Sequence, residues 1–446
     1  MKKIILALLI INFAVPVSFG NESKDIQALS LQECLTVALT NHPSLKKSQG
    51  AIKAAEASIN QTKASNKIKV NATARTGLNG DYQFWDDRSY SGSLSLTISK
   101  ILYDTNVNKL NIEIGNENLF GIQESERQTR LNVAANAKKA YYDLVLKILA
   151  RDVEKEKLKN LEQHLITARG IYDVGNSSYI DVTKAESDFA SAQVSLLKAE
   201  NDILLSQEAL KIAMGINTDE DFDLALSTGL LLPKKSGEIK DLLKIAIKDR
   251  PDYKKIQHTL NADELSIKVA ARSNSPTITG SVGSDLSKSD GNKTGRDYSA
   301  AVSVNIPVED GGLTAAKVAQ ARAVLEQDQA DEESLRHTIN QEVKNAAFSL
   351  SNAIERAKSS EKSVQYSEEN LGLAQGRYEV GVGDPLEVSD AVNALATARY
   401  SLYQAIYDAQ TARTDLDLAI GHFPYELEIN SELGMRNSEL KKIIKN

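Results

Sequence analysis

Proline is scarce in this chain of 446 residues, and its absence from long stretches is informative. Of the eight prolines, none lies between Ser44 and Leu232, and a second proline-free run covers residues 308–384. Because a proline inside a helix costs about 3 kcal/mol, these runs permit very long helices. Aromatic residues are also few, at 5% of the chain. Compact domains rarely lack both, so we expect an extended protein rather than two or three globular domains.

Other absences exclude whole classes of function. The single cysteine, Cys34, rules out an internal disulfide framework and a thiolate metal cluster. The five histidines stand singly, and the sequence contains no HExxH, P-loop, nucleophile elbow or complete GxGxxG. A net charge of −7 lacks the basic surplus of a nucleic-acid binder. We therefore expect no catalytic residues, no metal site, no cofactor and no nucleic-acid partner.

The first twenty residues have the pattern of a secretory signal peptide. Lys2 and Lys3 precede an apolar stretch at 4–15, and small residues end the segment at Gly20. A retained membrane anchor is the alternative, but the apolar stretch is short for a span. We predict a signal peptide at 1–20. No cysteine lies near the cleavage point, so we expect no N-terminal lipid.

The rest of the chain consists of two copies of one repeat. A shift of 208 residues aligns Pro43 with Pro251, and a shift of 206 aligns Gly175 with Gly381. A period this long indicates a duplication and not a solenoid. The predicted parts are a first repeat, a linker, a second repeat and a C-terminal segment, at residues 21–215, 216–238, 239–421 and 422–446.

Each repeat reads as a helix, a β-hairpin, a very long helix and a further helix. In the first repeat these elements are expected at 31–65, 68–99, 106–174 and 178–215. In the second they are expected at 239–272, 276–308, 312–379 and 385–421. A helix of roughly 68 residues would be roughly 100 Å long.

The strands alternate between apolar and polar residues with period two. The apolar positions are Leu94, Leu96 and Ile98 in the first hairpin and Val302, Val304 and Ile306 in the second. A soluble sheet with one face on a core would show the same pattern. We favour a transmembrane barrel with these residues facing lipid, because strands of about ten residues fit a tilted span. Four strands cannot close a barrel, so several chains must contribute, and three would give a wider lumen than two.

The last helix of each repeat carries a heptad seam rich in alanine. The seam runs from Val182 to Ala213 and, 206 residues later, from Val388 to Ala419. It predicts antiparallel coiled-coil pairing with the preceding long helix, although an ordinary two-helix core would show it as well. Gly175 and Gly381 can each end a helix in the left-handed conformation. Helix starts follow, at Ser178 in the first repeat and at Asp384-Pro385 in the second.

The two turns share the motif Tyr-x-Val-Gly-(x5)-[Asp/Glu]-Val, beginning at Tyr172 and at Tyr378. With the duplication and the strands, this motif resembles the TolC-type outer-membrane efflux family over residues 31–425. The resemblance implies a mainly α fold with a small β part. Three chains would form a twelve-stranded barrel in the outer membrane of a Gram-negative bacterium, continued by a periplasmic barrel of coiled-coil helices. It also implies short equatorial strands at 222–226 and 425–429.

The implied function is a passive exit duct for efflux or type I secretion. Its implied partners are two further copies of the chain, outer-membrane lipid, a periplasmic adaptor, and an inner-membrane pump of RND, ABC or MFS type. The runner-up interpretation is a secreted periplasmic coiled-coil scaffold without a pore.

The resemblance also assigns roles to residues. Glu387 and Asp390 would form acidic rings that narrow the periplasmic aperture, and Asp181 would hold Tyr378 in a latch. For Glu387 a capping box with Asp384 is an alternative role. We expect Tyr378→Phe to raise conductance. The implied adaptor-docking tips consist of Val174, Gly175, Asn176, Ser177, Val380, Gly381, Val382, Gly383 and Asp384.

Overall fold

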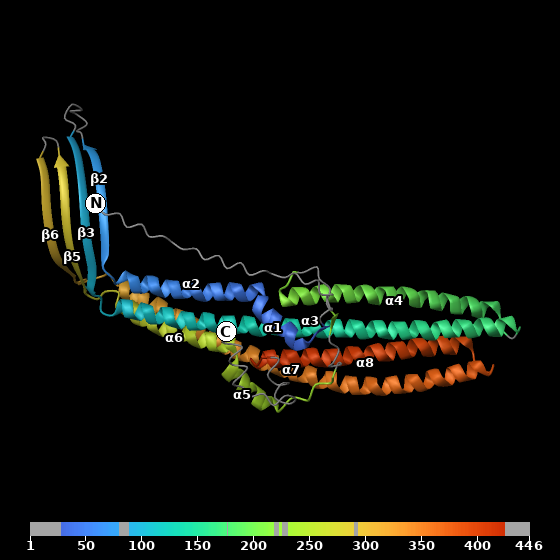
Figure 1. Cartoon of the computed structure of the whole chain (residues 1–446). Coiled ribbons are helices and arrows are strands. Elements are labelled where there is room, and N and C mark those ends of the chain that lie inside the picture. Colours follow the sequence, from blue (N-terminus) through green and yellow to red (C-terminus); the bar gives the residue numbers. More distant parts are fainter. Residues whose placement is uncertain are drawn as a thin grey trace, which may run out of the picture.

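A computed structural model describes residues 28–79, 89–175, 177–217, 223–224, 231–289 and 293–423. The molecule is elongated, with a β-sheet at one end and long helices running away from it (Figure 1). The expectation of a mainly helical fold with a small β part is therefore confirmed. The predicted signal peptide 1–20, the tip residue Asn176 and the equatorial strand 425–429 lie outside the described residues.

In the described part of the chain each repeat forms four helices, of which the third is by far the longest. The first repeat holds α1 Leu31–Asn41, α2 Pro43–Ser65, α3 Val107–Asp173 and α4 Tyr179–Met214. The second holds α5 Ile239–Asp249, α6 Pro251–Ala271, α7 Leu313–Glu379 and α8 Pro385–Ala419. Helices α3 and α7 have 67 residues each. At 1.5 Å per residue each is about 100 Å long.

The first helix of each repeat is broken, so the single helices predicted at 31–65 and 239–272 are wrong. The break falls at His42 (φ −60°, ψ 127°) and at Arg250 (φ −63°, ψ 127°). Both residues precede a proline, whose ring clashes with a preceding residue in helical conformation. Pro43 and Pro251 then occupy the first helical position of α2 and α6, where proline is favoured.

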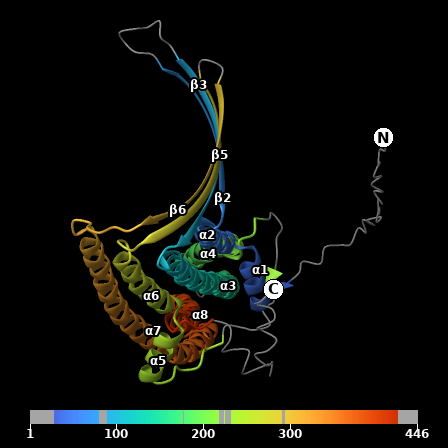
Figure 2. The same cartoon turned by 90° about the vertical axis from the view of Figure 1, so that its left-hand side faces the viewer.

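The main sheet is antiparallel and joins the hairpins of both repeats. Its order is β2-β3-β5-β6, so β2 and β6 are its two edges. The strands are β2 Lys69–Asn79, β3 Ser89–Tyr103, β5 Thr277–Ser289 and β6 Lys293–Asn305. In the end view of Figure 2 the sheet curves away from the helices. A second sheet pairs β1 Ala28–Leu29 in parallel with β4 Asp223–Leu224, and β4 lies within the equatorial strand predicted at 222–226.

The strand register gathers the predicted lipid-facing residues on one face of this sheet. Ile98 lies opposite both Val70 and Val282, and Val302 lies opposite Gly280 on that same face. Leu94, Leu96 and Val304 share it, whereas Ile306 follows the end of β6. The apolar side chains are exposed, Val302 at 69%. This face therefore needs a partner from outside the chain, which lipid would supply.

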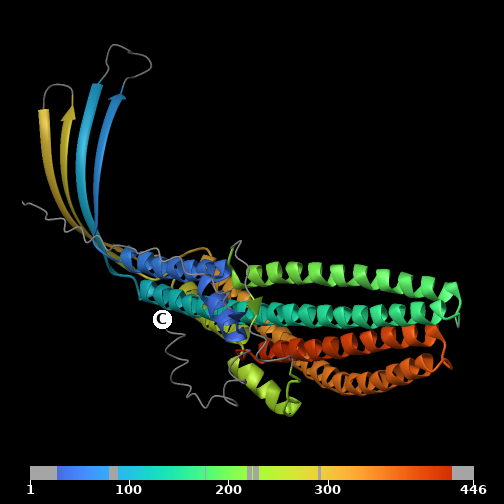
Figure 3. The ribbon, with the colours of Figure 1, turned by 45° about the vertical axis from the view of Figure 1, so that its right-hand side comes forward.

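The long helices are flanked along their length by shorter helices placed end to end. Helix α3 packs against α4 and α2, and α7 packs against α8 and α6. Figure 3 shows α3/α4 and α7/α8 as two hairpins whose tips lie farthest from the sheet. Every predicted seam position, from Val182 to Ala213 and from Val388 to Ala419, is buried or half-buried. The predicted coiled-coil pairing is confirmed.

A close backbone contact marks the joint between consecutive flanking helices. Gly215 ends α4 at φ +69°, and a Cβ there would lie 2.6 Å from the Cα of His42. Gly421 follows α8 at φ +73°, and its Cβ would lie 2.8 Å from the Cα of Arg250. Both glycines combine a left-handed conformation with a gap too small for a methyl group. The two repeats therefore build the same joint.

Cys34 lies on α1 and is fully buried among Tyr141, Leu210 and Met214. Burial raises the pKa of its thiol to about 12. Cys34 therefore serves as a small buried apolar residue.

Among the residues that the structure describes, no helix combines the length and the apolar character needed to cross a membrane.

We expect Gly215→Ala to lower the free energy of unfolding by about 2 to 4 kcal/mol, since it adds left-handed strain to a steric clash. Chemical denaturation at fixed protein concentration measures the change. Gly170→Ala is the control, because Gly170 lies within α3 with open space around its Cα. An alanine at this helical position should raise the free energy of unfolding by at most about 1 kcal/mol. Equal effects at both glycines would contradict the joint.

We expect Leu96→Arg to prevent assembly in the outer membrane, since arginine on a lipid-facing strand costs about 2 to 4 kcal/mol near the bilayer midplane. Ser95→Arg is the matched control on the opposite face of the same strand. The amount of protein in isolated outer membranes measures assembly. Normal assembly of Leu96→Arg would exclude a lipid-facing position.

Candidate gate at the hairpin tips

The two hairpin tips reverse the chain through glycines in the left-handed conformation. Gly175 has φ +81° and Gly381 has φ +76°. The predicted helix ends are confirmed at both positions. A valine precedes each glycine and is largely exposed, Val174 at 71% and Val380 at 73%. Each tip therefore presents apolar side chains at the end of a rigid coiled coil.

The tips differ in how the second helix starts. Ser178 and Asp181 form a capping box at α4, in which the Asp181 carboxylate accepts from the Ser178 backbone N–H at 3.3 Å. At α8 the Asp384 carboxylate accepts from the backbone N–H of Leu386 at 2.8 Å. The capping box expected for Glu387 is not found in this described turn. Its carboxylate instead lies 3.8 Å from the Arg377 guanidinium.

The predicted aperture residues Glu387 and Asp390 are both exposed. They lie three residues apart on α8, so their side chains share one side of the helix. Because Glu387 is not held by a cap, its carboxylate can face an aqueous space. The structure thus places two carboxylates together, one turn from the tip.

The predicted latch pair is close together but not hydrogen-bonded. Tyr378 is only 6% exposed, and its hydroxyl has no hydrogen-bond partner among the described residues. The Asp181 carboxylate instead accepts from the Ser177 hydroxyl at 2.6 Å, in addition to its capping bond. Burial raises the pKa of Tyr378, and the charges of Asp181 and Asp384 raise it further. A latch role for the pair stays a prediction, without the expected bond.

Sequence reasoning missed a group of polar residues where the two hairpins meet. The Ser389 hydroxyl on α8 donates to the Asp188 carboxylate on α4 at 2.6 Å, and Lys184 donates to the other Asp188 oxygen at 2.5 Å. The ring of His164 on α3 lies 5.2 Å from the ring of Tyr378 on α7. No motif marks these residues. The repeat does not mark them either, because the first-repeat counterpart of Ser389 is Thr183.

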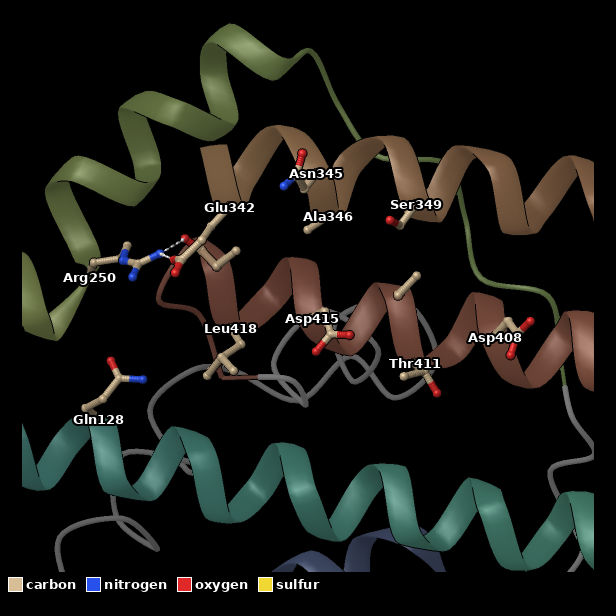
Figure 4. A pocket seen from close by; sticks show the side chains of 12 residues that line it. Gln128, Arg250, Glu342, Asn345, Ala346, Ser349, Asp408, Thr411, Asp415 and Leu418 are labelled. Carbon is tan, nitrogen blue, oxygen red and sulfur yellow. Dashed lines mark hydrogen bonds and ion pairs between the residues drawn. The ribbon is translucent and has the colours of Figure 1, made fainter. Parts of the chain in front are cut away.

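A second polar centre lies at the joint of the second repeat. Arg250 is 8% exposed, pairs with Asp252 and Glu342, and donates to the Ala419 carbonyl at 3.1 Å. A cation at this position stabilises the C-terminal end of α8. Figure 4 shows Arg250 beside a groove of about 560 Å³ that α3, α7 and α8 line. No cluster of three or more metal-ligating side chains occurs in the part of the chain that the structure describes.

Comparison with known proteins identifies the family. The outer membrane efflux protein family matches this chain twice, over residues 34–216 and over residues 242–422. The two matches begin 208 and end 206 residues apart, the same shifts that align the repeats. The chain belongs to the outer membrane efflux protein family. The predicted resemblance and duplication are confirmed.

Relatives of this efflux protein match it over most of its length. The probable outer membrane lipoprotein SilC of Salmonella typhimurium is 22% identical over 86% of this chain and 84% of its own. TolC of Escherichia coli is 22% identical over 91% of this chain and 85% of its own. The solved open-state MtrE channel of Neisseria gonorrhoeae has a TM-score of 0.74 at 20% identity, covering 88% of this chain and 89% of its own.

These likenesses fix the general function. The family is one of outer-membrane transport channels and not a family of enzymes. The protein is therefore an outer-membrane efflux channel that extends into the periplasm.

We expect stability to fall with acidification through His164. Burial lowers the pKa of His164, and the nearby Asp188 opposes this more weakly. The folded protein thus binds fewer protons at this site than the unfolded chain, where histidine titrates near 6.5. The melting temperature should drop as the pH falls below about 6.5, and His164→Gln should reduce that drop. His337→Gln is the control, since His337 is exposed, and coinciding curves for all three proteins would contradict the assignment.

Proposed function

We propose that three copies of this chain assemble into the exit duct of a tripartite export system. The observation that carries the proposal is the four-stranded sheet, with its free edges at β2 and β6 and its exposed apolar face. Unpaired backbone groups are too costly in lipid, so each edge has to pair with another copy until a barrel closes. Two copies would give eight strands and an interior filled by side chains, whereas three leave room for a passage.

The helical hairpins would continue this passage through the periplasm. Three copies bring six hairpins side by side, in line with a barrel about 100 Å long. The exposed valines at the tips, Val174, Val380 and Val382, suit docking of a periplasmic adaptor. That adaptor would connect the duct to an inner-membrane pump of RND, ABC or MFS type. Substrate choice would then belong to the pump, while the duct conducts passively.

A secreted scaffold without a pore is the competing function. The sheet argues against it, because a soluble scaffold would leave Leu96, Val302 and their neighbours on one face in water. The duct gives this face lipid as its partner.

Under three-fold symmetry Glu387 and Asp390 become two carboxylate rings at the aperture. The test compares purified wild-type protein with the double variant Glu387→Gln and Asp390→Asn in planar bilayers. Rings of carboxylates favour cations, so we expect the preference for potassium over chloride to fall at least about twofold in the variant. Glu200→Gln is the control, because it removes an exposed carboxylate from the middle of α4.

Unchanged selectivity in the double variant would remove the aperture role from these two residues. Absence of any channel activity in the wild-type protein would contradict the duct itself.

A further inference from the structure

The two hairpins are joined by polar links along α8. Ser389 bonds to Asp188, Arg399 pairs with Glu156, and Asp415 pairs with Lys139. The last two links are partly exposed. They lie further from the hairpin tips, towards the joint at the end of α8. Exposed ion pairs contribute little because water and salt screen them. Ser389 lies only four residues after Pro385, so its link is the one nearest the tip.

The Ser389–Asp188 bond is also the best shielded of these links. Ser389 is 2% exposed, and the Asp188 side chain is 15% exposed. Its length of 2.6 Å fits a hydroxyl that donates to an ionised carboxylate, which is a strong type of hydrogen bond. Sequence neighbours of both residues belong to an apolar cluster, which limits the access of water to the bond and strengthens it. That cluster includes Leu161, Ala192, Leu371, Val388, Ala391 and Val392.

The expected latch between Asp181 and Tyr378 is not formed in this region. The Tyr378 hydroxyl is buried without a partner among the described residues, and Asp181 is engaged by the start of its own helix. Helix α8 packs chiefly against α7 and α3, so its contact with α4 is small. In that small contact the Ser389–Asp188 bond joins the two helices near their tips.

We propose that the Asp188–Ser389 hydrogen bond is the clasp that holds the α7/α8 hairpin against the α3/α4 hairpin and keeps the aperture closed. The clasp rests on the proposed duct function. To widen the aperture, α8 has to move away from α4, and this movement breaks the bond in each of the three copies. Lys184 on α4 and His164 on α3 are the charged or titratable groups beside Asp188, and neither links it to α8.

The chain offers a matched control for this bond. Ser206 on α4 is 4% exposed, and its hydroxyl donates to the Asp143 carboxylate on α3 at 2.7 Å. This is also a serine-to-aspartate hydrogen bond with a similarly buried serine, but both of its residues belong to the α3/α4 hairpin. Loss of this bond should lower stability without releasing one hairpin from the other.

The experiment records single channels of the purified full-length protein in planar bilayers. We expect Ser389→Ala to raise the open fraction about tenfold, since three equal bonds are lost together. Asp188→Ala should do the same, and the double variant should add nothing, as a double-mutant cycle requires for two partners of one bond. Ser206→Ala should leave the open fraction at the wild-type value while lowering the melting temperature. If Ser389→Ala does not assemble, Asp188→Ala is compared with Ser206→Ala in the same way.

Two results would overturn the clasp alone: wild-type gating in Ser389→Ala, or equal opening in Ser389→Ala and Ser206→Ala. A higher open fraction in Tyr378→Phe but not in Ser389→Ala would show that Tyr378, and not Ser389, holds the aperture closed. Absence of channels in the wild-type protein would overturn the duct, and the clasp with it.

Discussion

A helix of 67 residues can keep its apolar side out of water only if other helices pack along all of it. This constraint shapes the whole molecule. Helix α3 is covered by α4 and α2, and α7 is covered by α8 and α6, each pair meeting end to end at a glycine joint. Because the covering helices run towards the sheet, chain reversals are confined to the tips and joints. The sheet is therefore attached at the end of the long helices that is opposite the hairpin tips.

The parts that sequence could predict are those with local patterns. The heptad seam, the left-handed glycines and the alternating strands each depend on nearby residues, so their periods survive in the sequence. The break before Pro43 was missed because the helical pattern continues on both sides of it. The Asp188–Ser389 bond has no such pattern, since its partners are 201 residues apart and on different hairpins. Only the relative placement of the two hairpins brings them together.

Duplication has let the two tips diverge while their backbones stayed alike. In the first repeat the acidic residue after the tip, Asp181, is held by the start of its own helix. In the second repeat Asp384 and Pro385 start the helix without help from the next acidic residue. That leaves Glu387 available for another role, with the Arg377 guanidinium 3.8 Å from its carboxylate. The acidic residue of the shared turn motif thus caps a helix in the first repeat and is available for a functional role in the second.

The buried thiol of Cys34 has a consequence for biogenesis. Once α1 has packed, the sulfur is inaccessible and its raised pKa keeps it protonated, so folded chains cannot exchange disulfides. A chain that has crossed into the oxidising periplasm but has not yet folded still presents that one thiol. Two such chains can join through a single covalent bridge. The share of bridged dimers on a non-reducing gel therefore records how often chains met one another before they folded.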